Sequence, residues 1–245
     1  MNKIIKLVIV LGMYLHASGV QAFGKEFLDF GFYQMEYSCE HKGYNWIQYA
    51  TVPDSGELKR YKGFHLENKL PELCRKKSTS TFKRPVGTTQ YHRGHGVHSN
   101  LWDHSVEMMR STNTMANVVP HEAYQNVHGL WRYTEKLTEC YRDLGTVNVW
   151  LGNIWGNVET NDHFLLSHGV TTPDFLWKVL VRGDGEINAW IIPNNRQATQ
   201  YNVARYEVSV QEILDTVSYQ VPGLEAIARF NTAKTWWLPK GCSLR

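Results

Sequence analysis

The segment Gln90–Asn100, QYHRGHGVHSN, contains three histidines at a spacing of three residues, His92, His95 and His98. Imidazole nitrogens bind zinc and copper, so three converging rings would form a metal site. Imidazole also accepts a proton near neutral pH, so a single ring beside Arg93 would place a general base next to an anion-binding group. The residue types therefore indicate metal binding, acid–base chemistry on an anion, or a polar loop without chemistry.

The spacing of the histidines supports a three-histidine zinc site only weakly. Residues three apart on an extended segment face opposite sides, and in a helix Gly94 and Gly96 would each cost about 1 kcal/mol. The segment is therefore predicted to be a loop or a strand end, where three rings can converge but need not. The sequence also lacks the HExxH pattern of many zinc hydrolases.

His95 alone fits the role of a general base, with Arg93 as its anion-binding partner. The neighbouring glycines would let the backbone pass close to a substrate. A phosphate ester, however, requires charge neutralisation by arginines or a metal ion. This hypothesis therefore predicts further polar residues elsewhere in the chain.

Such residues follow in a fixed order: Asn117 begins the pentapeptide NVVPH, and Asn126, Trp131 and Glu135 come after it. With Arg93–His95, this order resembles the sugar-nonspecific DNA/RNA endonucleases of the ββα-metal (His-Me finger) group. Their pattern is Asp-Arg-Gly-His, then Asn-hydrophobic-x-Pro-Gln, then a metal-binding Asn, a Trp and a Glu on one helix.

The resemblance implies a role for each matching residue. His95 would activate the water that attacks phosphorus, Asn126 would hold one Mg²⁺ ion, and Glu135 would orient a water on that ion. An amide oxygen is a suitable hard ligand for Mg²⁺, which keeps several waters and gains further ligands from substrate phosphate. Mn²⁺ or another divalent ion is an alternative.

The same resemblance, which extends over residues 44–219, implies how substrate is bound. Arg93 would steady the scissile phosphate, and Arg60 is the nearest candidate for a second, upstream arginine. Asn117 is also expected to bind substrate. The implied activity is hydrolysis of DNA and RNA to products with 5′-phosphates.

Three departures from the family pattern are present. His92 replaces the Asp, His121 replaces the Gln, and nine positions separate Asn126 from Glu135 where eight are usual. On a regular helix nine residues turn by about 900°, which would place the two side chains on opposite faces. Gly129 offers a solution, because Asn126 could lie on a bulge or before the regular helix.

Extended segments in the sequence predict a central antiparallel sheet. Asn45–Val52 and Thr146–Trp155 are rich in β-branched and aromatic residues. Phe175–Arg182 and Glu186–Ile192 flank the turn Gly183–Gly185, as in a β-hairpin.

Helical patterns lie between these strands. Candidates are Asp103–Met115, the longer segment His121–Gly145, and a helix that starts near Ser209, where Glu212 completes a capping-box pattern. Strands and helices in this order indicate an α+β fold, with helices flanking the sheet and a ββα-metal active-site motif, rather than alternating βαβ units. No repeat interrupts the pattern, and a single nuclease domain over residues 23–245 is expected.

The N-terminus is typical of a secretory signal peptide. Lys3 and Lys6 precede the apolar run Leu7–Leu15, and small residues lead to a cleavage position after Ala22. The run is shorter than the roughly 20 residues of a membrane span, and no other segment is suited to span a bilayer. Residues 1–22 are therefore predicted to direct export to the periplasm or the cell exterior.

Export would expose four cysteines, Cys39, Cys74, Cys140 and Cys242, to an oxidising compartment. They lack CxxC spacing, so two disulfides are predicted rather than a zinc site. Of three possible connectivities, Cys39 with Cys74 and Cys140 with Cys242 is favoured, because the second pair would hold the C-terminus against a helix. Four buried free thiols are the alternative.

The overall charge identifies no partner. The formal net charge is +3, and it falls to +1 without the signal segment, which has two lysines and no acidic residue. A local basic cluster comprises Arg75, Lys76, Lys77, Lys83 and Arg84. It is either a solvated loop or a surface that follows phosphates.

The leading prediction is an exported Mg²⁺-dependent endonuclease that hydrolyses DNA and RNA with little sequence preference. Contact through phosphates explains such breadth, because the backbone carries no base information. The alternative from another class is a non-catalytic protein that binds nucleic acid or metal on a nuclease scaffold, for which the three departures argue.

Overall fold

A computed structural model describes residues 24–85, 87–230 and 236–243 of the 245-residue chain. The expected signal peptide, residues 1–22, lies outside the described residues. Within the described part of the chain, no helix combines the length and the apolar character that crossing a bilayer requires.

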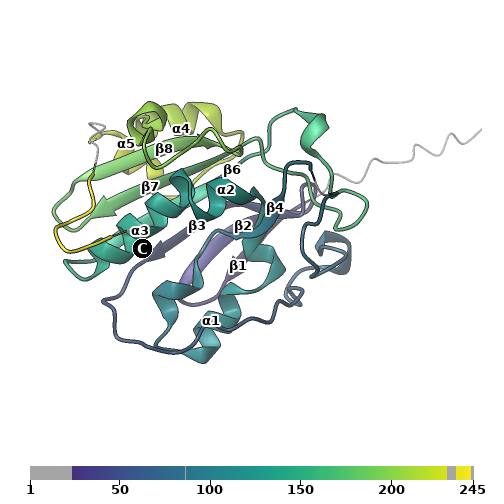
Figure 1. Cartoon of the computed structure of the whole chain (residues 1–245), viewed down its shortest axis with the longest axis horizontal. Coiled ribbons are helices and arrows are strands. Elements are labelled where there is room, and N and C mark those ends of the chain that lie inside the picture. The colour runs from purple at the N-terminus through teal and green to yellow at the C-terminus, as the bar shows by residue number, and fades with distance from the viewer. Residues whose placement is uncertain (1–23, 86, 231–235, 244–245) are drawn as a thin grey trace, which may run out of the picture.

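A six-stranded antiparallel sheet forms the centre of the fold (Figure 1). The spatial order is β1-β2-β3-β6-β7-β8, and each pair of neighbours is antiparallel. The predicted α+β class with a central antiparallel sheet is thereby confirmed. The strands are β1 (Lys25–Asp29), β2 (Tyr33–Ser38), β3 (Gly43–Ala50), β6 (Val147–Ile154), β7 (Phe175–Arg182) and β8 (Ile187–Pro193).

The extended segments predicted from composition are these central strands, and the predicted hairpin joins β7 to β8. The amide of Arg182 donates to Glu186 O at 3.0 Å, and the amide of Gly185 donates to Arg182 O at 3.0 Å. Gly185 has a φ of 86°, a left-handed conformation that glycine adopts without a Cβ penalty. The turn residues thus fix the register of β7 against β8.

Different helices cover the two faces of the sheet. Because successive side chains of a strand point to opposite faces, Ile47 and Leu151 join one apolar cluster while Trp46 and Trp150 join the other. The first cluster contains residues of α3, and the second contains residues of α4 and α5, which lie near β8 at the top of Figure 1. These helices are α3 (Leu130–Arg142), α4 (Val210–Thr216) and α5 (Leu224–Ala228).

A separate two-stranded sheet carries the histidine segment. β4 (Tyr91–His95) pairs antiparallel with β5 (Val118–Glu122), with His92 opposite His121. α2 (Ala123–Val127) and α3 follow β5, which gives the strand–strand–helix order of a ββα motif. The connection between the two strands contains the α-helix α1 (Val106–Thr112). Short 3₁₀ helices complete the described fold: η1 (Glu72–Cys74), η2 (Ser99–Trp102), η3 (Met115–Asn117), η4 (Glu159–Asn161) and η5 (Val203–Tyr206).

The predicted helix His121–Gly145 is wrong in its first part. Its first two residues belong to β5, because pairing with β4 holds them extended, and the remainder is divided into α2 and α3. The capping box at the start of α4 is confirmed: Ser209 Oγ accepts from the amide of Glu212 at 3.1 Å, and Glu212 Oε2 accepts from the amide of Ser209 at 2.7 Å. The capping box could be predicted from residues close together in the sequence, whereas the extended conformation of β5 depends on its pairing with β4.

Two disulfides, Cys39–Cys74 and Cys140–Cys242, have the predicted connectivity. The first joins the end of β2 to η1, and the second joins α3 to the C-terminal segment. They enclose sequence separations of 35 and 102 residues. Cross-links over such long loops stabilise a fold mainly by restricting the unfolded chain.

Candidate active site

A cleft of about 430 Å³ lies beside the ββα motif, and five residues predicted from sequence line it together. They come from the loop before η1, from β4, from α2 and from α3. The fold thereby brings residues up to 75 positions apart in the sequence into one site. The five are Arg60, Arg93, His95, Asn126 and Glu135.

His95 ends β4 and is buried, with 7% of its surface exposed at the cleft. Its Nε2 lies 2.8 Å from Asn113 Oδ1. The amide nitrogen of Asn113 donates at 3.0 Å to the carbonyls of both Tyr61 and Gly63. Because these two bonds fix the amide orientation, Asn113 Oδ1 is an acceptor and His95 Nε2 carries the proton. The lone pair of Nδ1 is left available.

The surroundings of His95 keep its ring neutral. Burial lowers the pKa of His95 to about 4, with smaller lowering contributions from Arg60 and Arg93, while the bond to Asn113 opposes the shift. A neutral ring is the form that accepts a proton, so His95 is in the correct state for a base at neutral pH.

The backbone around His95 needs its two glycines. A Cβ on Gly94 would lie 2.3 Å from Nδ1 of His121, and one on Gly96 would lie 2.5 Å from Ile47. The glycines thus make room for protein side chains, and a close approach of the backbone to substrate stays a prediction.

Arg93 is held at the edge of the cleft by contacts on two sides. Its guanidinium lies 3.7 Å from the centre of the Phe64 ring, and its Nη1 donates to Thr79 O at 2.8 Å. The Phe64 ring also lies 5.4 Å from that of His95. One of five guanidinium N–H groups is used by Thr79, so the arginine retains donors for a phosphate.

Asn126 lies on α2, before α3 begins, which removes the difficulty of the nine-residue spacing. The amides of His128 and Gly129 both donate to Tyr124 O, at 2.8 and 2.9 Å, and end α2 before α3 begins. A Cβ on Gly129 would lie 2.5 Å from Ala198 O, so this close approach requires glycine. Asn126 and Glu135 therefore line the same cleft from two separate helices.

Glu135 belongs to a buried charge network on α3. Arg132 Nη1 lies 3.4 Å from Glu135 Oε2 and 3.1 Å from Glu139 Oε1. Burial raises the pKa of Glu135, and the positive charges of Lys178 and Arg132 oppose that rise. Lys178 Nζ, which is itself buried, donates to Thr134 Oγ1 at 2.9 Å. Arg132, Lys136 and Lys178 thus compensate the carboxylates of Glu135 and Glu139 beside the cleft.

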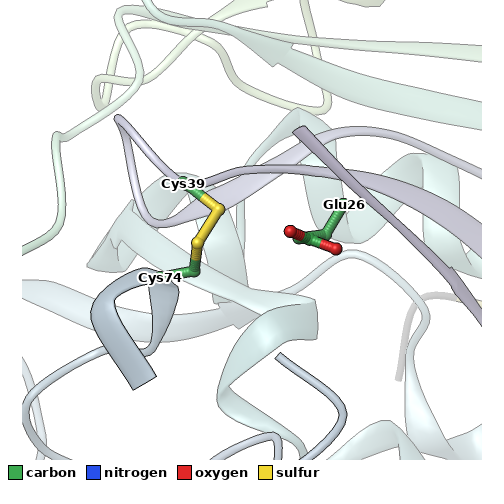
Figure 2. Close-up of side chains that lie close together, drawn as sticks. All are labelled: Glu26, Cys39 and Cys74. Atoms are coloured by element: carbon green, nitrogen blue, oxygen red, sulfur yellow. A yellow bond between two sulfur atoms is a disulfide. The ribbon is translucent and has the colours of Figure 1, made fainter. Parts of the chain in front are cut away.

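The three-histidine zinc site is not formed. His95 and His98 line the cleft, but His92 lines a neighbouring hollow. Ligand atoms of three His, Cys, Asp or Glu residues come within 4.8 Å of one another at one place in the described residues, at Glu26, Cys39 and Cys74. Figure 2 shows that these two cysteines form a disulfide, so they offer no thiolate to a metal.

Asn117 does not line the cleft, which disagrees with its expected role in substrate binding. It is fully buried, and its Nδ2 donates to Val97 O and Thr112 O at 2.9 and 2.8 Å. Its Oδ1 accepts from the amide of Val97 at 2.8 Å, and its backbone carbonyl accepts from Gly96. Asn117 therefore holds the turn that follows His95, and we assign it a structural role.

The basic cluster of the sequence is not one phosphate-binding surface. Lys76 is buried and donates to Met115 O at 2.8 Å, and Arg75 donates to Leu70 O and Asn68 O. None of its five members lines the cleft. Two of them stabilise the fold, which neither sequence interpretation anticipated.

The sequence did not identify Phe64, Asn113 or Arg132 as parts of the site. Arg132 had a detectable signal, since it lies three residues before Glu135 on a predicted helix, where side chains meet. Phe64 and Asn113 had none, because their contacts with Arg93 and His95 exist only after the chain has folded.

Buried neutral histidines predict that acid destabilises the fold. Burial lowers the pKa of His95 to about 4 and that of His121 to about 3, and it lowers the pKa of His98 as well. The unfolded chain therefore binds more protons than the native state as the pH falls below about 6.5. His95 and His121 are each expected to remove roughly 2 kcal/mol from the free energy of unfolding by about pH 4.5, and His98 acts in the same direction.

Urea unfolding between pH 7 and pH 4.5 measures this loss. Replacement His121→Gln removes one of the histidines and should reduce the pH dependence, whereas exposed His104→Ala should not. If the parent, His121→Gln and His104→Ala lose the same free energy of unfolding between pH 7 and pH 4.5, the contribution assigned to His121 is contradicted.

The sequence model of the DNA/RNA non-specific endonuclease family matches residues 13–222. A chain in the crystal structure of the EndoG/EndoGI complex has a similar fold, with a TM-score of 0.62 and 15% identity, over 80% of this chain and 84% of that chain. No curated protein matches the sequence. Because the family match covers more than half of the chain, the protein belongs to the DNA/RNA non-specific endonucleases, a family of phosphodiesterases.

Proposed function

We propose that this protein is an exported endonuclease that hydrolyses phosphodiester bonds of DNA and RNA with Mg²⁺, or with Mn²⁺ or another divalent ion in its place. One observation carries the proposal: Arg60, Arg93, His95, Asn126 and Glu135 line a single cleft, in which the hydrogen-bond network leaves His95 Nδ1 free to accept a proton. Family membership supplies the reaction class, and the cleft supplies residues of the required chemistry.

His95 is the general base in this proposal. Its Nδ1 takes a proton from water as the water oxygen attacks phosphorus, and the bond from phosphorus to the 3′-oxygen breaks. The 3′-oxygen leaves with the electron pair of the broken bond and takes a proton from solvent water, so one product ends in a 3′-hydroxyl and the other carries a 5′-phosphate. The proton on His95 Nε2 stays on the ring and is donated in a hydrogen bond to Asn113 Oδ1, which stabilises the imidazolium that forms.

The two arginines bind the phosphate. Arg93 approaches from β4, and Arg60 lies exposed at the rim of the cleft. Guanidinium groups match phosphate oxygens in charge and geometry, and they read no base identity. A site built on such contacts accepts both sugars, which supports a sugar-nonspecific activity.

Asn126 and Glu135 are the residues that would hold a divalent ion. An amide oxygen and a carboxylate are hard ligands that suit Mg²⁺, and both line the cleft together with the phosphate-binding arginines. When bound, the ion would neutralise charge on the phosphate in the transition state. Glu135 would accept hydrogen bonds from water in the shell of the ion.

Export is part of the proposal because two disulfides join all four cysteines. Such bonds persist in oxidising compartments. Cleavage after Ala22 would release the protein to the periplasm or the cell exterior.

Metal removal tests the function. Protein from residue 23 onward, with its disulfides intact, is expected to cut both plasmid DNA and RNA with Mg²⁺ and neither with EDTA. Asn126→Ala should raise the Mg²⁺ concentration for half-maximal rate by at least about tenfold, because a metal ligand is lost. The matched control Asn157→Ala, at an exposed position outside the cleft, should leave it unchanged.

Cleavage that persists in EDTA would contradict the metal assignment. If the protein binds nucleic acid but cuts neither polymer with any divalent ion, the non-catalytic binding protein becomes the correct interpretation.

A further inference from the structure

A second hollow, of about 580 Å³, lies directly beside the catalytic cleft. Val127 lines both depressions, and Asn126 of the cleft lies 3.5 Å from His92 of the hollow, measured between Asn126 Nδ2 and His92 Nδ1. The two are therefore parts of one continuous surface. Polar and aromatic side chains lining the hollow include Gln90, His92, Tyr124, His128 and Arg196.

The flat groups of the hollow lie next to one another. The guanidinium of Arg196 lies 5.2 Å from the centre of the Tyr124 ring, and the rings of Tyr124 and His128 are 5.8 Å apart, with their planes tilted by 47°. His92, His128 and Arg196 are exposed to solvent. Aromatic rings and guanidinium planes are the groups on which nucleic-acid-binding proteins stack bases irrespective of sequence.

The charge of the hollow also suits an anionic strand. Glu122 is its acidic residue, but it is 5% exposed and its Oε2 accepts from the amide of Gln125 at 2.8 Å. The exposed charge is that of Arg196. His92, which also lines the hollow, brings no carboxylate that would repel a phosphate.

We propose that this hollow binds a nucleotide of the substrate strand next to the scissile phosphate, with its base on Tyr124 and His128 and a flanking phosphate on Arg196. This inference rests on the proposed nuclease function and adds a substrate subsite to it. A single-stranded segment is the form recognised, because stacking on these rings requires an unpaired base.

Arg196→Ala tests the subsite, with Arg205→Ala as the matched control. Both arginines are exposed and lie over a tyrosine ring, but Arg205 does not line either depression. The binding arm uses a fluorescein-labelled single strand of about twelve nucleotides and proteins that also carry His95→Ala, which prevents cutting. The activity arm uses bis(p-nitrophenyl) phosphate, a diester with no nucleoside and no flanking phosphate for Arg196 to bind.

Arg196→Ala is expected to raise the Kd for the strand about tenfold, as for loss of one charged contact. It should also lower the salt slope of binding by about 0.7, the value for one phosphate on a single strand. Arg205→Ala should change Kd less than twofold, and neither variant should alter hydrolysis of the small diester. Arg196→Lys should restore the salt slope without restoring the full affinity, because the charge returns but the bidentate guanidinium contact with the phosphate does not.

Unchanged strand binding in Arg196→Ala would overturn the subsite. The subsite would also be overturned if Arg196→Ala lowered strand affinity and hydrolysis of the small diester by the same factor, since Arg196 would then act on the catalytic cleft itself. If the parent protein hydrolyses no diester, the nuclease proposal fails, while the Kd comparison still decides whether the hollow binds a nucleotide.

Discussion

Replacement of His95 by alanine is expected to lower kcat/KM on plasmid DNA and on RNA by about 10³-fold. The reason is that His98 also lines the cleft, but both of its ring nitrogens are buried and cannot reach an attacking water. Binding of uncut nucleic acid should change less than twofold, because Arg60 and Arg93 remain. Single-turnover rates and strand-binding anisotropy measure the two quantities separately.

Two further variants make this result interpretable. His95→Ala leaves Asn113 Oδ1 buried without its donor, which costs about 1–3 kcal/mol. His95→Gln can donate to that oxygen but cannot act as a base, so it should fold more stably and be equally inactive. His104→Ala, an exposed histidine outside the cleft, should retain full activity. Activity within tenfold of the parent in His95→Gln would exclude His95 as the base.

The parts of the fold that local sequence determines were predictable. The hairpin at Gly185 and the capping box at Ser209 depend on residues a few positions apart, so their chemistry is visible in the sequence. The disulfide pairing was also correct, although spacing alone allowed three connectivities. In contrast, β5 was read partly as helix, because its extended conformation depends on pairing with β4.

The candidate site was predictable as a set of residues but not as a mechanism. The order of His95, Asn126 and Glu135 could be read, and Gly129 indicated the position of the helix break. The state of the base could not be read, because the tautomer of His95 depends on Asn113, and Asn113 depends on the carbonyls of Tyr61 and Gly63, 50 or more residues away. Such a chain of contacts has no local pattern.

Asn113→Ala is expected to lower kcat by about 10²-fold with little change in KM. Asn113 is a positioning residue: its Oδ1 holds the proton on His95 Nε2 and so leaves Nδ1 as the base. Without that acceptor the proton can occupy Nδ1, and the ring can rotate away from the attacking water. Steady-state kinetics on a defined oligonucleotide separates kcat from KM.

A purely structural role would produce a similar loss, because Asn113 also donates to Tyr61 O and Gly63 O. Asn113→Asp distinguishes the two roles. Aspartate and alanine both lose the two donated bonds, but aspartate keeps an acceptor oxygen for His95 Nε2. If Asn113 acts on His95, the Asp variant should be at least about tenfold more active than the Ala variant at neutral pH.

The pH profile gives an independent measure of the same contact. In the parent, burial lowers the pKa of His95 to about 4, so the base should stay neutral and kcat/KM should not fall through its protonation until the pH approaches that value. A carboxylate at position 113 would stabilise the imidazolium and raise the pKa of His95. The acid limb of kcat/KM should therefore move to higher pH in Asn113→Asp, because protons then compete for Nδ1 earlier. Equal activity losses in the two variants, with an unmoved acid limb, would show that Asn113 serves the fold rather than the tautomer of the base.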